Sequence, residues 1–215
     1  MDDEVERVGA RYRSVRLRLT AVLAPLDEAQ WDRPVPACPG WRVRDVLGHL
    51  LGNVEDALAG RISGPPTEDQ TREQVARHAD DDPVALLQQW NEQAPEFEDV
   101  LDAVPIWPAF IDAISHEHDI RAALGDQRGR DTDDVLRAAE LLAVPPPGLG
   151  LVVDGRAYGD DEVDARLTTT SFELLRIRLG RRSEAQVRAM EWDGSPDGRL
   201  AGLFVFGPSV LDQAE

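Results

Sequence analysis

Apolar side chains recur at steps of three and four positions in the first 124 residues, the spacing that gathers them on one face of an α-helix. Four such stripes cover residues 5–22, 43–58, 84–101 and 108–123. Pro95 lies inside the third stripe and is expected to kink or split that helix. The polar stretch 60–82, which contains Asp80-Asp81-Asp82, is expected to form a surface loop. Because amphipathic helices bury their stripes most economically against one another, the pattern predicts an up-and-down four-helix bundle.

The segment Pro145-Pro146-Pro147-Gly148 marks a change in the pattern, because it cannot continue a helix. After it, short apolar runs predict strands at 149–154, 163–167, 187–192 and 200–206. Thr170-Ser171-Phe172-Glu173 has the sequence of a capping box, and the helix that it opens should end at Gly180. The sequence therefore predicts an α+β protein with a helical bundle at residues 1–144 and a small α+β domain at residues 145–215.

The charge balance excludes several kinds of partner. The chain has 41 acidic side chains against 23 basic ones, all arginine, and a formal net charge of −18. Nucleic-acid binding requires clustered cations, a membrane span requires about 18 consecutive apolar residues, and a Walker-type phosphate loop or a Schiff base requires lysine. Residues 1–6 are acidic and do not resemble a secretory signal. The single cysteine, Cys38, is interpreted as a packed thiol and fits a reducing cytoplasm, where we expect the protein to reside.

Two of the four histidines lie on inward-facing stripes. Asp112 precedes His116 by one helical turn, so the carboxylate and the imidazole project from one face about 6 Å apart. His49 lies at the edge of the second stripe, whereas His78 falls in the polar stretch and His118 points away from the His116 face. A divalent cation could be bound by His49, Asp112 and His116 in the core of a bundle. Alternatively, the histidines are packed core residues and the acid forms only an i,i+4 pair.

Three segments carry a resemblance to a known family. They are Cys38-Pro39-Gly40-Trp41-Arg42-Val43-Arg44-Asp45-Val46-Leu47-Gly48-His49-Leu50, Asp112-Ala113-Ile114-Ser115-His116-Glu117-His118-Asp119-Ile120-Arg121, and Ser171-Phe172-Glu173-Leu174-Leu175 with Gly180-Arg181-Arg182-Ser183. The first two resemble the helix motifs of the mycothiol-dependent maleylpyruvate isomerase family, a DinB-like branch of metal-binding four-helix bundles. The third is similar to the sterol-carrier-like C-terminal part that many members carry.

The resemblance implies a ligand set. His49, Asp112 and His116 match the residues that bind zinc or another divalent ion and leave coordination positions open. The best-known members have glutamate in place of Asp112, and the shorter aspartate could alter the metal preference. The residue after Trp41 is often a threonine that caps the following helix; Arg42 cannot accept that hydrogen bond, so the cap must come from elsewhere.

The resemblance also implies thiol chemistry. In the family the thiol is mycothiol, which the isomerase adds to a conjugated double bond and expels after rotation, while other relatives are thought to transfer it onto electrophiles. Metal coordination stabilises the thiolate, the nucleophilic form. The implied function is a metal- and mycothiol-dependent isomerase or S-transferase acting on a small electrophile. The alternatives are a non-catalytic metal-binding module with a sensor or regulatory role, or a purely structural bundle, and the substrate does not follow from kinship of fold.

Four further residues are candidates for supporting roles. Asp119 lies three positions after His116 and could orient its imidazole or merely support the helix. Arg176, Arg181 and Arg182 could bind a carboxylate of the substrate or cofactor, or could form a solvated helix end. Because the chain has no lysine, an anionic group in the substrate or thiol must be met by arginine or by the metal.

Overall fold

The protein forms two compact units, Met1–Asp126 and Gln127–Glu215. The computed structural model describes residues 7–62 and 64–213. Val5 of the first apolar stripe and the acidic start of the chain lie outside the described residues. A helical N-terminal part followed by a small α/β region confirms the predicted α+β fold class.

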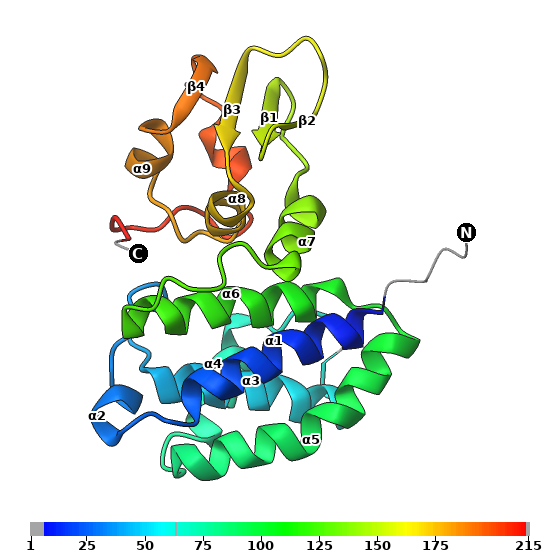
Figure 1. Ribbon diagram of the computed structural model, residues 1–215, viewed down its shortest axis with the longest axis vertical. Helices are drawn as coiled ribbons and strands as arrows, with labels where there is room; N and C mark the ends of the chain where they lie inside the picture. Colours follow the sequence, from blue (N-terminus) through cyan, green and yellow to red (C-terminus); the bar gives the residue numbers. More distant parts are fainter. Residues whose placement is uncertain (1–6, 63, 214–215) are drawn as a thin grey trace. The chain divides into compact units, whose positions relative to one another are not determined.

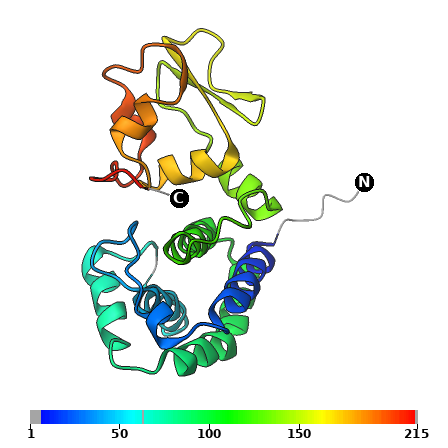
Figure 2. The same cartoon turned by 60° about the vertical axis from the view of Figure 1, so that its left-hand side comes forward.

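Within residues 7–62 and 64–126, the first unit is a bundle of four long helices (Figures 1 and 2). These are α1 (Val8–Leu23), α3 (Val43–Leu58), α5 (Pro83–Ala103) and α6 (Trp107–Leu124), accompanied by the short helices α2 (Glu28–Trp31) and α4 (Glu68–Arg77). Both α1 and α3 pack against α5 and α6. The apolar stripes meet in the interior, where Leu19, Leu47 and Leu101 are fully buried. Burial of these stripes stabilises the bundle.

The relative directions of α1, α3 and α5 follow from which of their ends lie close together. Leu26, Arg44 and Pro83 line one cavity, so the end of α1 and the starts of α3 and α5 share one end of the bundle (Figure 1). The chain reverses between α1 and α3, as in an up-and-down bundle, whereas α3 and α5 run in the same direction. The segment 59–82 therefore returns the chain along the length of α3.

The expectation that residues 60–82 form a surface loop is wrong, because this segment contains α4. Thr67 and Gln70 form a capping box at its start, with the Gln70 backbone amide donating to Thr67 Oγ1 at 3.3 Å and the Thr67 backbone amide donating to Gln70 Oε1 at 2.9 Å. The helix packs on α3 through Gln74, which is buried against Gly52. A Cβ atom on Gly52 would lie 2.6 Å from Gln74 Cβ. Because this contact joins a glycine to a polar side chain, the sequence of α4 has no apolar stripe that would predict the helix.

Helix α5 continues through Pro95 as one helix, so of the two outcomes expected there, a kink or a split, the split does not occur. Trp90 and Phe97, on either side of the proline, are both buried. Their rings pack edge-on against Tyr12, with ring centroids 6.5 and 5.3 Å away. We attribute the continuity to this packing, which offsets the backbone hydrogen bond that proline cannot donate.

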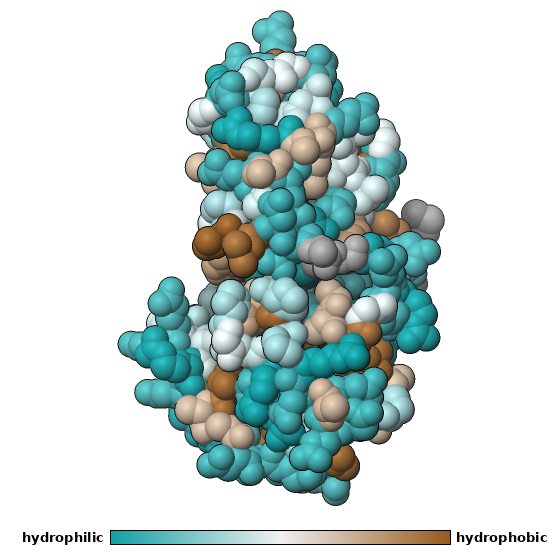
Figure 3. Space-filling model, turned by 90° about the vertical axis from the view of Figure 1, so that its left-hand side faces the viewer, coloured by the Kyte–Doolittle hydropathy of each residue, from teal (hydrophilic) through white to brown (hydrophobic). Residues whose placement is uncertain are grey.

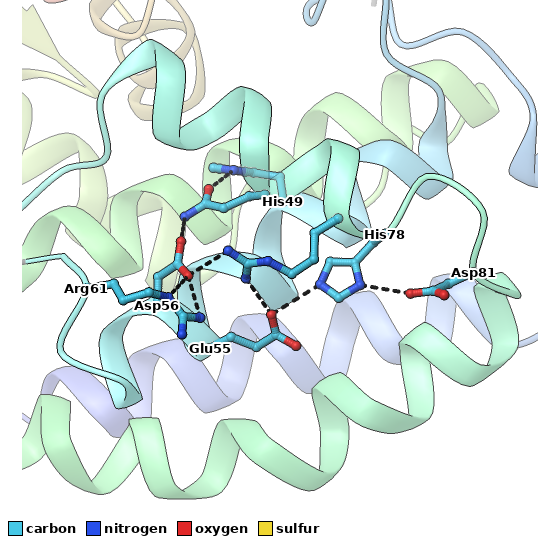
Figure 4. Close-up of polar contacts among 8 residues, drawn as sticks. His49, Glu55, Asp56, Arg61, His78 and Asp81 are labelled. Carbon is cyan, nitrogen blue, oxygen red and sulfur yellow. Dashed lines mark hydrogen bonds and ion pairs between the residues drawn. The ribbon is translucent and has the colours of Figure 1, made fainter.

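A buried carboxylate ties α4 to α3. Asp56 on α3 accepts hydrogen bonds from Gln74 Nε2 at 2.8 Å, from Arg61 Nε at 2.7 Å and from Arg77 at 2.9 Å (Figure 4). Burial alone would raise the pKa of Asp56, but these three donors outweigh burial and hold the pKa below its ordinary value. Asp56 is thus an ionised acceptor at neutral pH.

We expect Asp56→Asn to lower the free energy of unfolding at neutral pH, with a difference from wild type that narrows below about pH 4. The pKa of Asp56 is lower in the folded than in the unfolded protein, so its contribution is present above the unfolded pKa and is lost as the pH falls through the folded one. Urea unfolding at a series of pH values measures the difference. Asp69→Asn is the control, since Asp69 is exposed on α4 and pairs only locally with Arg72. A difference that stays constant with pH would contradict the prediction.

In residues 127–213, the second unit combines short helices with four strands. The elements are α7 (Asp133–Leu142), β1 (Leu149–Val153), β2 (Arg156–Tyr158), β3 (Ala165–Thr169), α8 (Ser171–Arg178), α9 (Glu184–Arg188), β4 (Glu191–Gly194) and the 3₁₀ helix η1 (Leu200–Leu203). The sheet order is β2-β1-β3-β4, with β1 and β3 parallel and the outer pairs antiparallel. As expected, the helix after Thr170 ends before Gly180, whose φ of +75° favours glycine.

Two predicted strands of this unit are wrong in whole or in part. Residues 200–206 begin with η1, and only the end of the predicted strand 187–192 belongs to β4. Leu200 and Leu203 are both buried at a spacing of three, which matches the repeat of a 3₁₀ helix. A short apolar run cannot distinguish these structures. The contacts of α7 with α8 place α7 in the second unit, whereas the proline segment predicts a boundary after α7.

The surface reflects the high charge of the sequence. Figure 3 shows a face that is mostly hydrophilic, with apolar residues in separate small patches. Within residues 7–62 and 64–213, none of the helices has the length and apolar character that crossing a bilayer requires.

Candidate metal centre

Helices α3 and α6 bring His49, Asp112 and His116 together. One ligand atom from each residue lies within 4.8 Å of the other two. Nε2 of His49 lies 3.3 Å from Asp112 Oδ2, and Nε2 of His116 lies 3.4 Å from Asp112 Oδ1. Both histidines are buried, whereas the Asp112 side chain is 37 % exposed, so the cluster opens to solvent beside the carboxylate. All three residues that the sequence predicts as ligands thus face one point.

The opposite nitrogen of each imidazole meets an oxygen. Nδ1 of His49 lies 2.9 Å from Gln74 Oε1, and Nδ1 of His116 lies 3.1 Å from Asp119 Oδ2. If each Nδ1 donates to its oxygen, the Nε2 atoms of the neutral rings present lone pairs to the Asp112 carboxylate. Acceptors that face one another repel unless a proton or a cation lies between them. Two imidazoles and a carboxylate arranged in this way fit a divalent ion.

The charge balance of the cluster shifts two pKa values. Burial would raise the pKa of Asp112, but the nearby His116 and His49 outweigh burial and lower it. Burial would also lower the pKa of His116, but the Asp112 charge and hydrogen bonds to Asp112, Asp119 and Cys38 raise it well above the ordinary value. The cluster therefore holds a negative carboxylate that favours positive charge beside it.

Asn53, which the sequence analysis did not single out, completes the inner wall of the cluster. Its Nδ2 lies 3.2 Å from His49 Nε2 and donates to Asp112 Oδ2 at 3.1 Å. Its Oδ1 is buried and accepts no hydrogen bond from the described residues. A buried oxygen of this kind suits a bound water or thiol as donor. The only signal in the sequence is its position one helical turn after His49.

The loop before α3 covers the imidazoles with an aromatic ring. The Trp41 ring centroid lies 5.4 Å from that of His49 and 6.2 Å from that of His116. Trp41 therefore excludes water from one side of the cluster.

The cap of α3 comes from Asp45, whose Oδ2 accepts from the Arg42 backbone N–H at 2.7 Å, as expected for a chain in which Arg42 cannot cap.

Cys38 lies behind His116, on the side away from Asp112. Its Sγ is 3.9 Å from His116 Nδ1 and donates to Asp119 Oδ2 at 3.5 Å. Of the two roles considered for Asp119, orientation of the imidazole agrees with this geometry, because its carboxylate contacts His116 directly. Cys38, Asp119 and His116 also form a compact group of possible donors, but that group uses the opposite nitrogen of the same ring.

The other histidines lie outside this cluster, and the candidate arginines belong to the second unit. His78 lies at the end of α4 between Asp81 and Glu55 (Figure 4), and His118 belongs to no donor group in the part of the chain described. The solvated helix end considered for the arginines is wrong for Arg176 and Arg182, because both are buried. Arg182 donates to both carboxylate oxygens of Glu173 at 2.8 Å, and Arg181 donates to the Leu179 carbonyl at 2.6 Å, all within the second unit.

Residues 12–113 match the family model described as the mycothiol maleylpyruvate isomerase N-terminal domain. This part of the chain, just under half of its length, is similar to that domain. The match includes His49 and Asp112 and ends before His116, whose place in the cluster rests on the geometry. No curated protein matches the sequence.

Two solved structures share the fold of this protein. A crystal structure of a histidine-to-alanine mutant of the mycothiol-dependent maleylpyruvate isomerase has 14 % identity and a TM-score of 0.58, covering 81 % of this chain and 88 % of its own. A crystal structure of the mycothiol-dependent maleylpyruvate isomerase has 16 % identity and a TM-score of 0.53, covering 82 % and 89 %. At this identity the likeness establishes the fold, and the chemistry must be argued from the site.

Proposed function

We propose that this protein is a metal- and mycothiol-dependent enzyme of the isomerase or S-transferase type that acts on a small electrophile. Its divalent ion, zinc or a similar metal, would be held by His49, Asp112 and His116. The observation that carries the proposal is the convergence of one atom from each of these residues to within 4.8 Å of the others. The match to the family model and the names of the two similar structures support mycothiol as the thiol.

The chain's own residues prepare the site for this chemistry. A bound divalent ion favours the thiolate form of a coordinated thiol, and the thiolate is the nucleophile. Gln74 and Asp119 hold the two imidazoles by their Nδ1 atoms, and Trp41 shields them from water. The exposed side of Asp112 leaves room for a thiol and an electrophile to approach. These features support an enzyme with open coordination positions.

Metal content tests the ligand set. Purified wild-type protein is expected to hold about one divalent ion per chain, and His49→Ala and His116→Ala less than about a tenth of that. His78→Ala is the matched control, since His78 is a buried histidine of the same unit whose partners are Glu55 and Asp81. Elemental analysis provides the measurement. Full metal content in both ligand variants would show that the ion binds elsewhere.

Thiol binding separates the enzyme from a non-catalytic metal-binding module. In cobalt-substituted protein, mycothiol is expected to change the visible spectrum, because a thiolate that joins the coordination sphere alters the ligand field. A spectrum that does not respond to saturating mycothiol would favour the binding module with a sensor or regulatory role.

A further inference from the structure

Gln74 joins the metal cluster to a second buried network. It lies on α4, is completely buried, and contacts two residues of α3 that are two helical turns apart. Its Oε1 lies 2.9 Å from His49 Nδ1, and its Nε2 donates to Asp56 Oδ2 at 2.8 Å. Figure 4 shows His49 and Asp56 at the two ends of this connection. The side-chain amide of Gln74 therefore connects the Asp56 carboxylate to the His49 ring through two hydrogen bonds.

The arginines that bind Asp56 fix the direction of each hydrogen bond between Asp56, Gln74 and His49. Arg61 and Arg77 can only donate, and both donate to Asp56 Oδ1, at 2.7 and 2.9 Å. The ionised Asp56 carboxylate can only accept, so the Gln74 group that faces Oδ2 must be its Nε2 amide nitrogen. The amide oxygen of Gln74 then faces His49. Because that oxygen can only accept, the His49 ring must carry a hydrogen on Nδ1.

This order of donors leaves the other nitrogen of His49 ready to bind a cation. A neutral imidazole with hydrogen on Nδ1 has its lone pair on Nε2, the atom that faces Asp112. We propose that Gln74 is a positioning residue that fixes the Nδ1–H tautomer and the ring orientation of His49. The proposal rests on the proposed function, since it treats His49 as a metal ligand. Gln74 itself touches neither Asp112 nor His116 in the described contacts.

The packing of α4 keeps the amide in place. Gly52 lies one turn after His49 on α3, and a Cβ atom there would lie 2.6 and 2.7 Å from Cβ and Cγ of Gln74. The stem of Gln74 thus rests directly on the α3 backbone, and burial leaves its amide little freedom to rotate. Gly48, one turn before Gly52 on α3, makes a similar contact, because a Cβ atom there would lie 3.2 Å from His78 Cβ.

The test uses the full-length, metal-free protein and two variants of α4. In wild type, imidazole ¹⁵N shifts are expected to show His49 with hydrogen on Nδ1. Gln74→Leu should give a mixture of tautomers at His49 and a zinc Kd weaker by about 10–100-fold. His78→Gln perturbs the same helix–helix contact without touching His49, and it should change neither quantity. Melting temperatures show whether the two variants lose comparable stability.

A double variant tests the direction of the relay. In Asp56→Asn with Gln74→Glu, the new amide accepts from the arginines and donates to the new carboxylate, which in turn accepts from His49. This exchange keeps the net charge and is expected to restore the Nδ1–H tautomer. Asp56→Asn alone turns an amide N–H toward Gln74, so the Gln74 oxygen faces position 56, its Nε2 faces His49, and the Nε2–H tautomer of His49 is expected. Recovery in the double variant therefore reports positioning rather than general packing.

Two results separate this proposal from the proposed function. If His49 keeps the Nδ1–H signature in Gln74→Leu and the zinc Kd stays within about twofold of wild type, Gln74 does not position His49. If Gln74→Leu scrambles the tautomer but wild-type protein binds no zinc, cobalt or other divalent ion, the positioning of His49 is supported and the metal-dependent function is overturned.

Discussion

Replacing Asp112 by asparagine is expected to weaken zinc binding at least about 100-fold, whereas Asp112→Glu should change the zinc Kd by less than about tenfold. Asparagine keeps the size of the side chain but removes the negative charge that both Nε2 atoms face at 3.3 and 3.4 Å. Glutamate keeps the charge. It is also the residue that stands at this position in the best-known members of the family that the sequence resembles. Competition with a chromophoric chelator at fixed pH measures both constants.

Asp81→Asn is the control for this comparison. Asp81 pairs with the buried His78 in the same unit, so its replacement removes a carboxylate beside a histidine without touching the cluster. It should leave the zinc Kd unchanged. Wild-type affinity in Asp112→Asn would show that the carboxylate does not bind the ion, and a large loss in Asp112→Glu would show that the cluster is matched to the shorter side chain.

The long helices could be predicted because burial imposes a period on the sequence. The second apolar stripe predicts a helix over residues 43–58, the bounds that α3 has. Helix α4 could not be predicted in this way, because its contact surface consists of Gln74 and the glycine Gly52. Polar burial against a glycine depends on the partner helix, which a local pattern does not contain. The 3₁₀ helix Leu200–Leu203 was missed for a different reason, since four residues are too few to separate a period of two from one of three.

The candidate ligands could be predicted, but the residues around them could not. Asp112 and His116 share a helix face by their spacing, and His49 follows from the resemblance together with its place near a stripe. Gln74 and Asn53 are amides on helix surfaces, where most such residues are solvated, and nothing in their spacing indicates burial. Their roles become visible only when α4 and α6 are placed against α3.

Replacing the buried Glu98 by glutamine is expected to cost about 3–5 kcal/mol in the free energy of unfolding and to lower the Tm by about 10 °C. Glu98 on α5 is 1 % exposed and accepts from Arg16 of α1 at 2.7 Å, and Arg16 is itself only 6 % exposed. Glutamine leaves the buried guanidinium with a neutral partner, Asn91, at 2.5 Å. Urea unfolding of the two proteins measures the difference.

The size of that effect depends on burial rather than on the number of ion pairs. Arg13 also binds Glu98, at 2.6 Å, but its side chain is 50 % exposed, so Arg13→Met should cost much less stability than Glu98→Gln. The double variant Arg16→Met with Glu98→Leu removes both buried charges and should recover most of the stability lost in Glu98→Gln, because neither desolvated group is left without its partner. Equal losses in Arg13→Met and Glu98→Gln would show that burial does not set the energy of this α1–α5 contact.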